Sequence, residues 1–161
     1  KDKDDKLGIL DVRVLLNNKE QIDIEIQVTA SEYWAERTLF YLGKMFTDQL
    51  KPGEDYQKLE KCIHVGILNF TLFDDQEYYS RFHFWSDQGR KMYSDKFEIH
   101  TLELPKLAKH EYPETELLKW LQFINAETKE EFEMAAEKSE YIKKAYRLLW
   151  SCFRKWNWKK K

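Results

Sequence analysis

Three polar side chains near the N-terminus have the types and the spacing to bind a metal ion. In segment 22–28 four β-branched residues alternate with acidic or amide residues, so Glu25 and Gln27 project from one face of a strand. Residues 17–19 are suited to a tight turn that would pair this strand with a preceding strand carrying Asp11. With both apolar faces on the core, Asp11 shares a surface with Glu25 and Gln27. Carboxylate and amide oxygens so placed can hold a hard divalent cation.

The same alternation has a simpler explanation, since any half-buried strand alternates polar and apolar residues. Asp11 and Glu25 would then be exposed carboxylates, and Gln27 a surface amide. Asp23 shares the face of Glu25 and is either an additional ligand or a solvated acid. An amide does not titrate, so Gln27 cannot be a general base, but it can aim an attacking water.

A helix over residues 32–50 is predicted to follow the hairpin, with Ser31 as its N-cap. Arg37 and Tyr41 lie one turn apart near the edge of its apolar stripe. They can contact a phosphate beside the metal, Arg37 as a bidentate donor. The alternatives are an ion pair between helices for Arg37 and a core position for Tyr41.

The remaining pattern predicts an α/β domain with a mixed central sheet. The apolar run at residues 62–73 predicts a buried strand, joined to the hairpin by a right-handed parallel crossover. Further strands are expected at residues 79–85 and 97–104. The C-terminal part predicts helices at residues 114–125 and from 128 to about 153, the second opening with a capping box.

Composition restricts the class of protein. The chain has 161 residues, 42% hydrophobic and 35% charged, which suits a folded domain. Two isolated cysteines, Cys62 and Cys152, give no disulfide framework or zinc spacing and fit a reducing cytoplasm. No apolar run reaches the roughly 20 residues of a membrane span. The net charge of −2 argues mildly against nucleic acid, although residues 141–161 carry eight Lys or Arg and no acid.

These residues together resemble the PD-(D/E)XK nuclease superfamily, and most closely its transposase-associated branch of recombination-promoting nucleases. The resemblance rests on residues 9–13 and 24–27, on Arg37 and Tyr41, and on residues 99–107, in this order. It covers most of the chain, from about residue 6 to about residue 149.

The superfamily usually has Lys where this chain has Gln27, and this branch is expected to carry Gln. The resemblance implies a restriction-endonuclease-like fold in residues 6–110, with a helical extension in residues 111–161 packed on it. It also implies a DNA endonuclease that uses Mg²⁺ or Mn²⁺, tied to mobile elements or recombination. Asp11 and Glu25 would be the metal ligands and Gln27 the third catalytic residue. The alternative is an inactive, nuclease-derived module that binds DNA or protein.

Superfamily members bring a further acidic residue and a core strand from a segment before the Asp strand. Only ten residues precede Asp11, and residues 1–6 are charged without apolar periodicity. We therefore expect an N-terminal element to be missing from the nuclease core, a weakly liganded metal, and poor activity of this chain alone. The uncovered core face is expected to favour a homodimer.

Overall fold

The computed structural model describes residues 9–17 and 19–158, with side chains from Val12 to Cys152 apart from residue 18. The chain divides into two compact units, residues 1–110 and 111–161. The first unit contains a sheet, one α-helix and two short 3-10 helices: β1 (Ile9–Leu16), β2 (Glu20–Gln27), α1 (Trp34–Thr47), η2 (Tyr56–Lys58), β3 (Cys62–Leu68), β4 (Tyr79–Trp85), β5 (Met92–Glu103) and η3 (Leu104–Lys106). The second unit is helical: α2 (Glu116–Ile124), α3 (Lys129–Glu137) and α4 (Glu140–Trp158).

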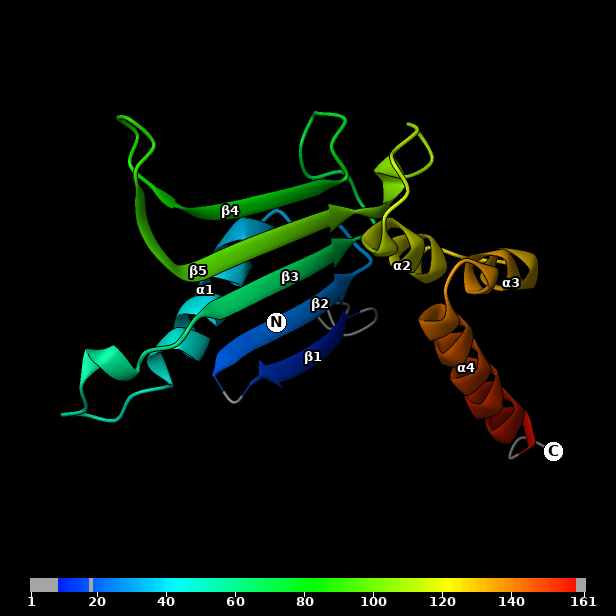
Figure 1. Cartoon of the computed structure of the whole chain (residues 1–161), viewed down its shortest axis with the longest axis horizontal. Coiled ribbons are helices and arrows are strands. Elements are labelled where there is room, and N and C mark those ends of the chain that lie inside the picture. Colours follow the sequence, from blue (N-terminus) through cyan, green and yellow to red (C-terminus); the bar gives the residue numbers. More distant parts are fainter. Residues whose placement is uncertain (1–8, 18, 159–161) are drawn as a thin grey trace. The chain divides into compact units, whose positions relative to one another are not determined.

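The five strands form one mixed sheet in the order β1-β2-β3-β5-β4 (Figure 1). The outer pairs, β1 with β2 and β4 with β5, are antiparallel, whereas β2, β3 and β5 run parallel. Helix α1 connects β2 to its parallel neighbour β3, because two parallel strands need a crossover connection, which is usually a helix. The predicted mixed α/β fold is confirmed.

The hairpin of β1 and β2 sets the position of the site. Asn17 has a φ of 51°, the left-handed backbone that asparagine tolerates in a tight turn. The resulting register pairs Asp11 with Glu25. On the other side of β2, Glu25 pairs with Gly66 of β3.

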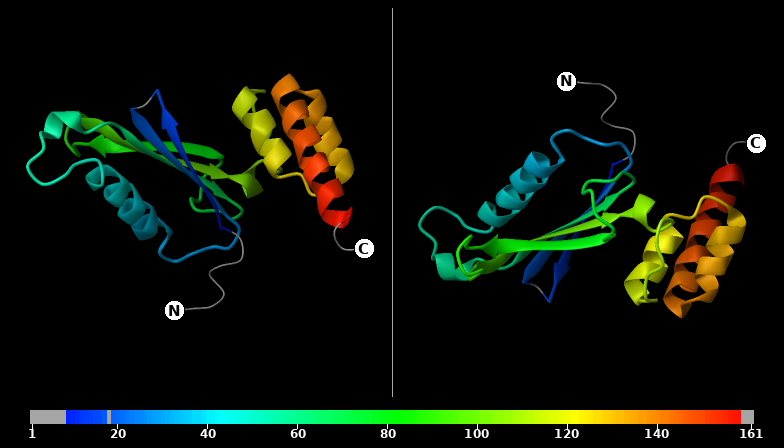
Figure 2. Two further views of the ribbon diagram at one scale, coloured as in Figure 1. Left: turned by 90° about the horizontal axis from the view of Figure 1, so that it is seen from below. Right: turned by 90° about the horizontal axis from the view of Figure 1, so that it is seen from above.

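Helix α1 covers one face of the sheet, which we call the helix-covered face (Figure 2). The helix is amphipathic, and Trp34, Thr38, Leu42 and Met45 are its buried residues. Leu42 and Met45 pack with the buried Cys62 at the start of β3.

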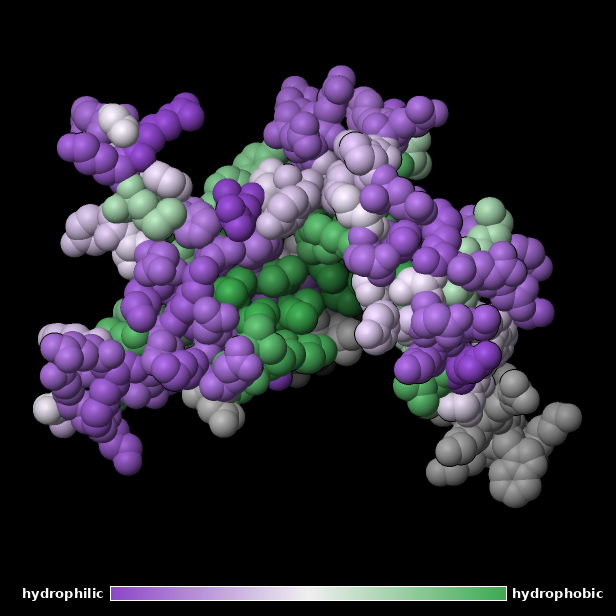
Figure 3. Space-filling model, viewed as in Figure 1, coloured by the Kyte–Doolittle hydropathy of each residue, from purple (hydrophilic) through white to green (hydrophobic). Residues whose placement is uncertain are grey.

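The opposite face of the sheet is apolar and partly exposed, and we call it the open face. Val12 of β1 is 42% exposed. Further apolar side chains alternate onto this face from β1, β2 and β3 and are half-buried: Val14, Ile22, Ile24, Ile26, Ile63 and Val65. Figure 3 shows apolar side chains gathered over these strands. The hairpin thus has its apolar side on the open face rather than beneath the helix.

Several boundaries differ from the sequence-based expectation. Helix α1 spans Trp34–Thr47 rather than residues 32–50, and its N-cap is Tyr33, so the expected cap by Ser31 is wrong. Strand β3 ends at Leu68 rather than at residue 73.

Strand β5 begins at Met92 rather than residue 97, because its first residues pair with Phe84 and Trp85 in an irregular antiparallel hairpin. The helix expected from residue 128 is two helices, α3 and α4. The break lets Ala135 and Ala136 of α3 and Ile142 of α4 pack in one cluster with Phe123 of α2.

The start of α3 follows its sequence signal. The Thr128 side chain accepts from the Glu131 backbone N–H, and Glu131 reaches back to the backbone of Thr128, which completes the capping box. Among the described residues, no helix combines the length and the apolar character that a membrane span needs.

Candidate active site

The polar row of β2 is buried on the helix-covered face. Asp23, Glu25 and Gln27 are 5%, 4% and 5% exposed. The alternative of exposed carboxylates and a surface amide is therefore wrong for Glu25 and Gln27. Burial of a carboxylate is costly unless charged or hydrogen-bonding groups compensate, so the partners of this row define the site.

Glu25 is paired with a cation from helix α1. Arg37 Nη2 lies 2.9 Å from Glu25 Oε1. The Arg37 guanidinium also lies over the Tyr41 ring, 5.6 Å from its centroid. Tyr41 is 38% exposed, so the alternative of a core position is wrong. Arg37 pairs with the sheet rather than with another helix. The structure thus brings Arg37 and Tyr41 beside Glu25.

Gln27 presents an unsatisfied oxygen. Its Nε2 donates to the Thr29 carbonyl at 3.0 Å. Its Oε1 is buried and has no hydrogen-bond partner in the described part of the chain. A buried acceptor without a donor is costly, which marks this atom as a place for a ligand, a cation or water.

Asp23 forms a second buried pair on the same face. Its Oδ2 lies 3.2 Å from Nδ1 of His64, a fully buried residue on β3. The Nε of Arg13 lies 3.8 Å from Asp23 Oδ1. Asp23 is therefore not a solvated acid. His64 was not a candidate from the sequence; its place in β3, opposite Asp23 in register, was the available signal.

The place of Asp11 is known from the backbone. It is the register partner of Glu25 on β1, and its side chain lies outside the described residues. Among the side chains that are described, no group of three or more His, Cys, Asp or Glu is arranged to hold a metal ion.

Comparison with known proteins identifies the family. The sequence model of the PD-(D/E)XK nuclease family transposases matches residues 1–155. The chain belongs to this family. No curated protein and no solved structure shows a significant match to it. PD-(D/E)XK nucleases generally use divalent metals and act on DNA, and the mixed sheet with its helices is consistent with their restriction-endonuclease-like fold.

The oxygen atoms on the polar row of β2 are suited to a hard cation. Glu25 supplies a carboxylate and Gln27 an amide oxygen that lacks a donor, two residues apart on one strand face. Oxygen ligands of this kind suit Mg²⁺ and Mn²⁺. The backbone register places Asp11 of β1 opposite Glu25.

Lys106 does not replace the lysine that the superfamily usually has at the position of Gln27. It lies beyond the end of β5, and its ammonium donates to Glu103 at 3.0 Å, to Asp75 at 2.7 Å and to the Glu77 carbonyl at 3.0 Å. Burial lowers the pKa of Lys106, but the hydrogen bonds to Asp75 and Glu103 raise it above its usual value. With three acceptors for three N–H groups, Lys106 fixes the loop before β4.

A separate polar cluster surrounds Glu98 on the open face. His83 Nε2 and His100 Nε2 lie 3.1 and 2.6 Å from the Glu98 carboxylate, and Lys61 is also paired with it. Burial raises the pKa of Glu98, but hydrogen bonds from Lys61 and His100 outweigh it and bring this pKa to about 2. The available sequence signal for this cluster was the alternation of polar and apolar residues on β4 and β5. It points to the cluster only when the register of these two strands is known. Lys61 supplies the positive charge that neutralises this buried carboxylate, which is a structural task.

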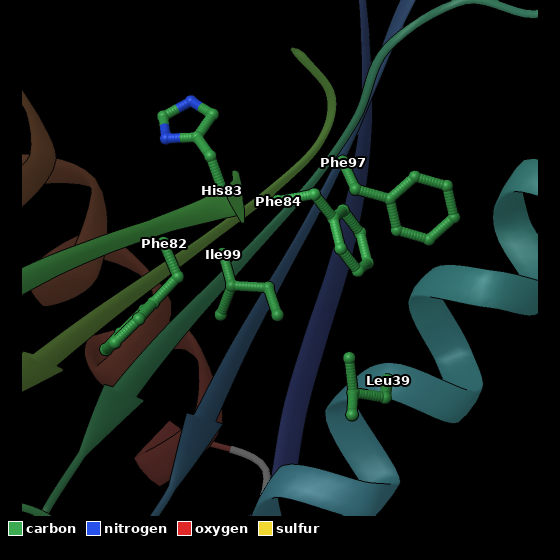
Figure 4. Close-up of a pocket in the computed structure, with 6 residues that line it drawn as sticks. All are labelled: Leu39, Phe82, His83, Phe84, Phe97 and Ile99. Carbon is green, nitrogen blue, oxygen red and sulfur yellow. The ribbon is translucent and has the colours of Figure 1, made fainter. Parts of the chain in front are cut away.

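The cavity between α1 and the β4–β5 end of the sheet is apolar. It measures about 110 Å³ and is lined by Leu39, Phe82, His83, Phe84, Phe97 and Ile99. Figure 4 shows the His83 ring directed away from the other side chains. The cavity therefore offers no oxygen ligands, and the polar row of β2 is the better candidate site.

Proposed function

We propose that the chain is a metal-dependent endonuclease that hydrolyses phosphodiester bonds of duplex DNA. One observation carries the proposal. Glu25 and Gln27 are buried side by side on β2, opposite Asp11 in register, in a chain of the PD-(D/E)XK transposase family. The Gln27 amide oxygen is buried without a donor, and a cation bound beside the Glu25 carboxylate would satisfy it.

In this proposal each residue of the candidate site has its own role in cleavage. Asp11 and Glu25 would hold Mg²⁺ or Mn²⁺, and such an ion, when bound, would supply polarisation of the phosphate and acidification of the attacking water. Gln27 orients that water through its amide, because it cannot take a proton itself. Arg37 and Tyr41, one turn apart on α1, contact the phosphate, Arg37 as a charged donor.

The biological setting belongs to the same proposal. The family implies a DNA substrate, and we place the activity in mobile-element transfer or recombination. Both Cys62 and Cys152 are free thiols, which supports a reducing cytoplasm as the location.

We further propose that the open face mediates self-association of the core. A contiguous apolar face is unfavourable in water, and a second copy offers the same face in a two-fold arrangement. The half-buried Ile24 and Val65 would lie near the middle of this interface, with Val12 towards its rim.

The rival function is an inactive module that binds DNA or protein. Its support is the Arg37–Glu25 pair, which neutralises Glu25 without any metal. A supercoiled plasmid incubated with Mn²⁺, with and without EDTA, separates the two. The endonuclease nicks the plasmid only while the metal is available; the module binds it unchanged in both conditions.

A further inference from the structure

Arg37 forms an ion pair with the Glu25 carboxylate, the group that would ligate a divalent cation. Its Nη2 lies 2.9 Å from Glu25 Oε1, which is a close ion pair. The Glu25 side chain is 5% exposed and that of Arg37 is 25% exposed. Arg37 is therefore the outer partner of the pair, on the side of Glu25 that reaches solvent.

A guanidinium and a dication compete for such a carboxylate. Like charges repel, and the repulsion grows where water is excluded, as it is around Glu25. A cation that ligates Glu25 and Gln27 on this face must therefore weaken or break the contact with Arg37. Metal affinity and the position of Arg37 are linked.

A guanidinium released from Glu25 keeps a partner in the Tyr41 ring. It already lies over Tyr41, which is half-exposed on the same helix. Within the described residues Glu25 is the carboxylate with which Arg37 forms an ion pair, and Arg37 Nε is buried without a hydrogen-bond partner. A guanidinium released from Glu25 thus lacks an anion, and a phosphate supplies one in a bidentate geometry.

We propose that Arg37 is a gate for the metal site. Without metal it pairs with Glu25, and a divalent cation breaks this pair while the guanidinium keeps its contact with the Tyr41 ring and binds a phosphate of DNA. This inference rests on the proposed metal site and adds the order of events. Metal binding prepares the DNA contact, and each ligand promotes the other by the same factor.

The test is metal binding in the absence of DNA. Mn²⁺ is titrated into the complete wild-type chain and into three variants, with free Mn²⁺ followed by electron paramagnetic resonance. Arg37→Met removes the competing charge and keeps the length of the side chain. Lys44→Met removes one charge from the exposed side of the same helix as a matched control. Glu25→Gln removes the ligand.

The gate predicts that Arg37→Met binds Mn²⁺ at least about fivefold more tightly than the wild type, the lower end of usual couplings between linked sites. Lys44→Met should match the wild type, and Glu25→Gln should lose binding. Equal or weaker binding by Arg37→Met, with binding still dependent on Glu25, would overturn the gate and leave the metal site intact. Absence of Mn²⁺ binding from the wild type and from Arg37→Met would overturn both.

Because Arg37→Met leaves Glu25 buried without its cation, its folding is checked by thermal unfolding with and without Mn²⁺. The gate predicts a lower melting temperature than the wild type without metal and a larger rise on adding it. A variant whose melting temperature does not respond to Mn²⁺, beside a responsive wild type, contradicts the gate.

Discussion

Trp34 lies directly on Gly66 beneath helix α1. A Cβ added to Gly66 would lie 2.5 Å from Trp34 Cζ2, closer than real contacts allow. Gly66 is also the register neighbour of Glu25. The absence of a side chain at this position is therefore what lets the helix approach the strand that carries the candidate site.

The first prediction follows from this contact. Gly66→Ala forces Trp34 and the start of α1 away from β3 and should lower the free energy of unfolding by about 1–3 kcal/mol. Urea denaturation measures it. Gly43→Ala is the matched control: Gly43 lies within α1 with no atom near its missing Cβ, so its replacement should be neutral or stabilising by up to about 1 kcal/mol. An equal response of the two variants would contradict the close packing.

Gln27 gives the second prediction. Gln27→Lys retains a polar group that can reach water, at the place where the wider superfamily has Lys, and should keep measurable nicking. Gln27→Ala removes the group and should lose on the order of 10- to 100-fold in rate. Nicking rates of the two variants in Mn²⁺ provide the measurement. Identical rates would remove Gln27 from the mechanism.

The open face gives the third. Val12→Lys places a charge on the apolar face and should shift the chain toward monomer, because burial of an unpaired ammonium is costly. Leu15, 57% exposed on the same strand, alternates to the other face and provides the control Leu15→Lys. Sedimentation velocity over a concentration series reads out both. An unchanged association constant for Val12→Lys would rule out this face as the interface.

A fourth prediction concerns acid stability. The pKa of Glu98 is about 2 in the folded chain, against an ordinary value near 4.5, so the unfolded state binds the proton more readily. The carboxylate therefore stabilises the fold above about pH 4.5, and this contribution is lost as the pH falls toward 2. In Glu98→Gln the free energy of unfolding should fall less over this interval. Urea titrations at several pH values compare the two, and parallel curves would contradict the assignment.

Much of the fold could be predicted from local sequence patterns. The alternation around Glu25, the asparagine turn and the apolar run of β3 predicted the hairpin, the shared face of Asp11 and Glu25, and the parallel crossover. Those signals depend on neighbouring residues only. The capping box of α3 is of the same kind.

Sequence did not reveal which face of β2 the helix covers. Alternation alone left a solvated polar row as an alternative because the groups that compensate its burial lie on other elements, Arg37 on α1 and His64 on β3. The same applies to Glu98, whose partners His83 and Lys61 come from other segments. Burial of a charge depends on tertiary partners, and alternation alone does not report them.

The central claim is that the carboxylate on the helix-covered face performs metal-dependent cleavage. Its most direct test compares plasmid nicking in Mn²⁺ by the wild type, Glu25→Gln and Glu98→Gln, at protein concentrations high enough to measure the poor activity expected of this chain alone. The two acids are equally buried, at 4% and 5% exposed, on opposite faces of the same sheet. If Glu25 ligates the metal, Glu25→Gln abolishes nicking, whereas a folded Glu98→Gln retains it. Nicking that survives Glu25→Gln, or that is lost equally in both folded variants, would contradict the account.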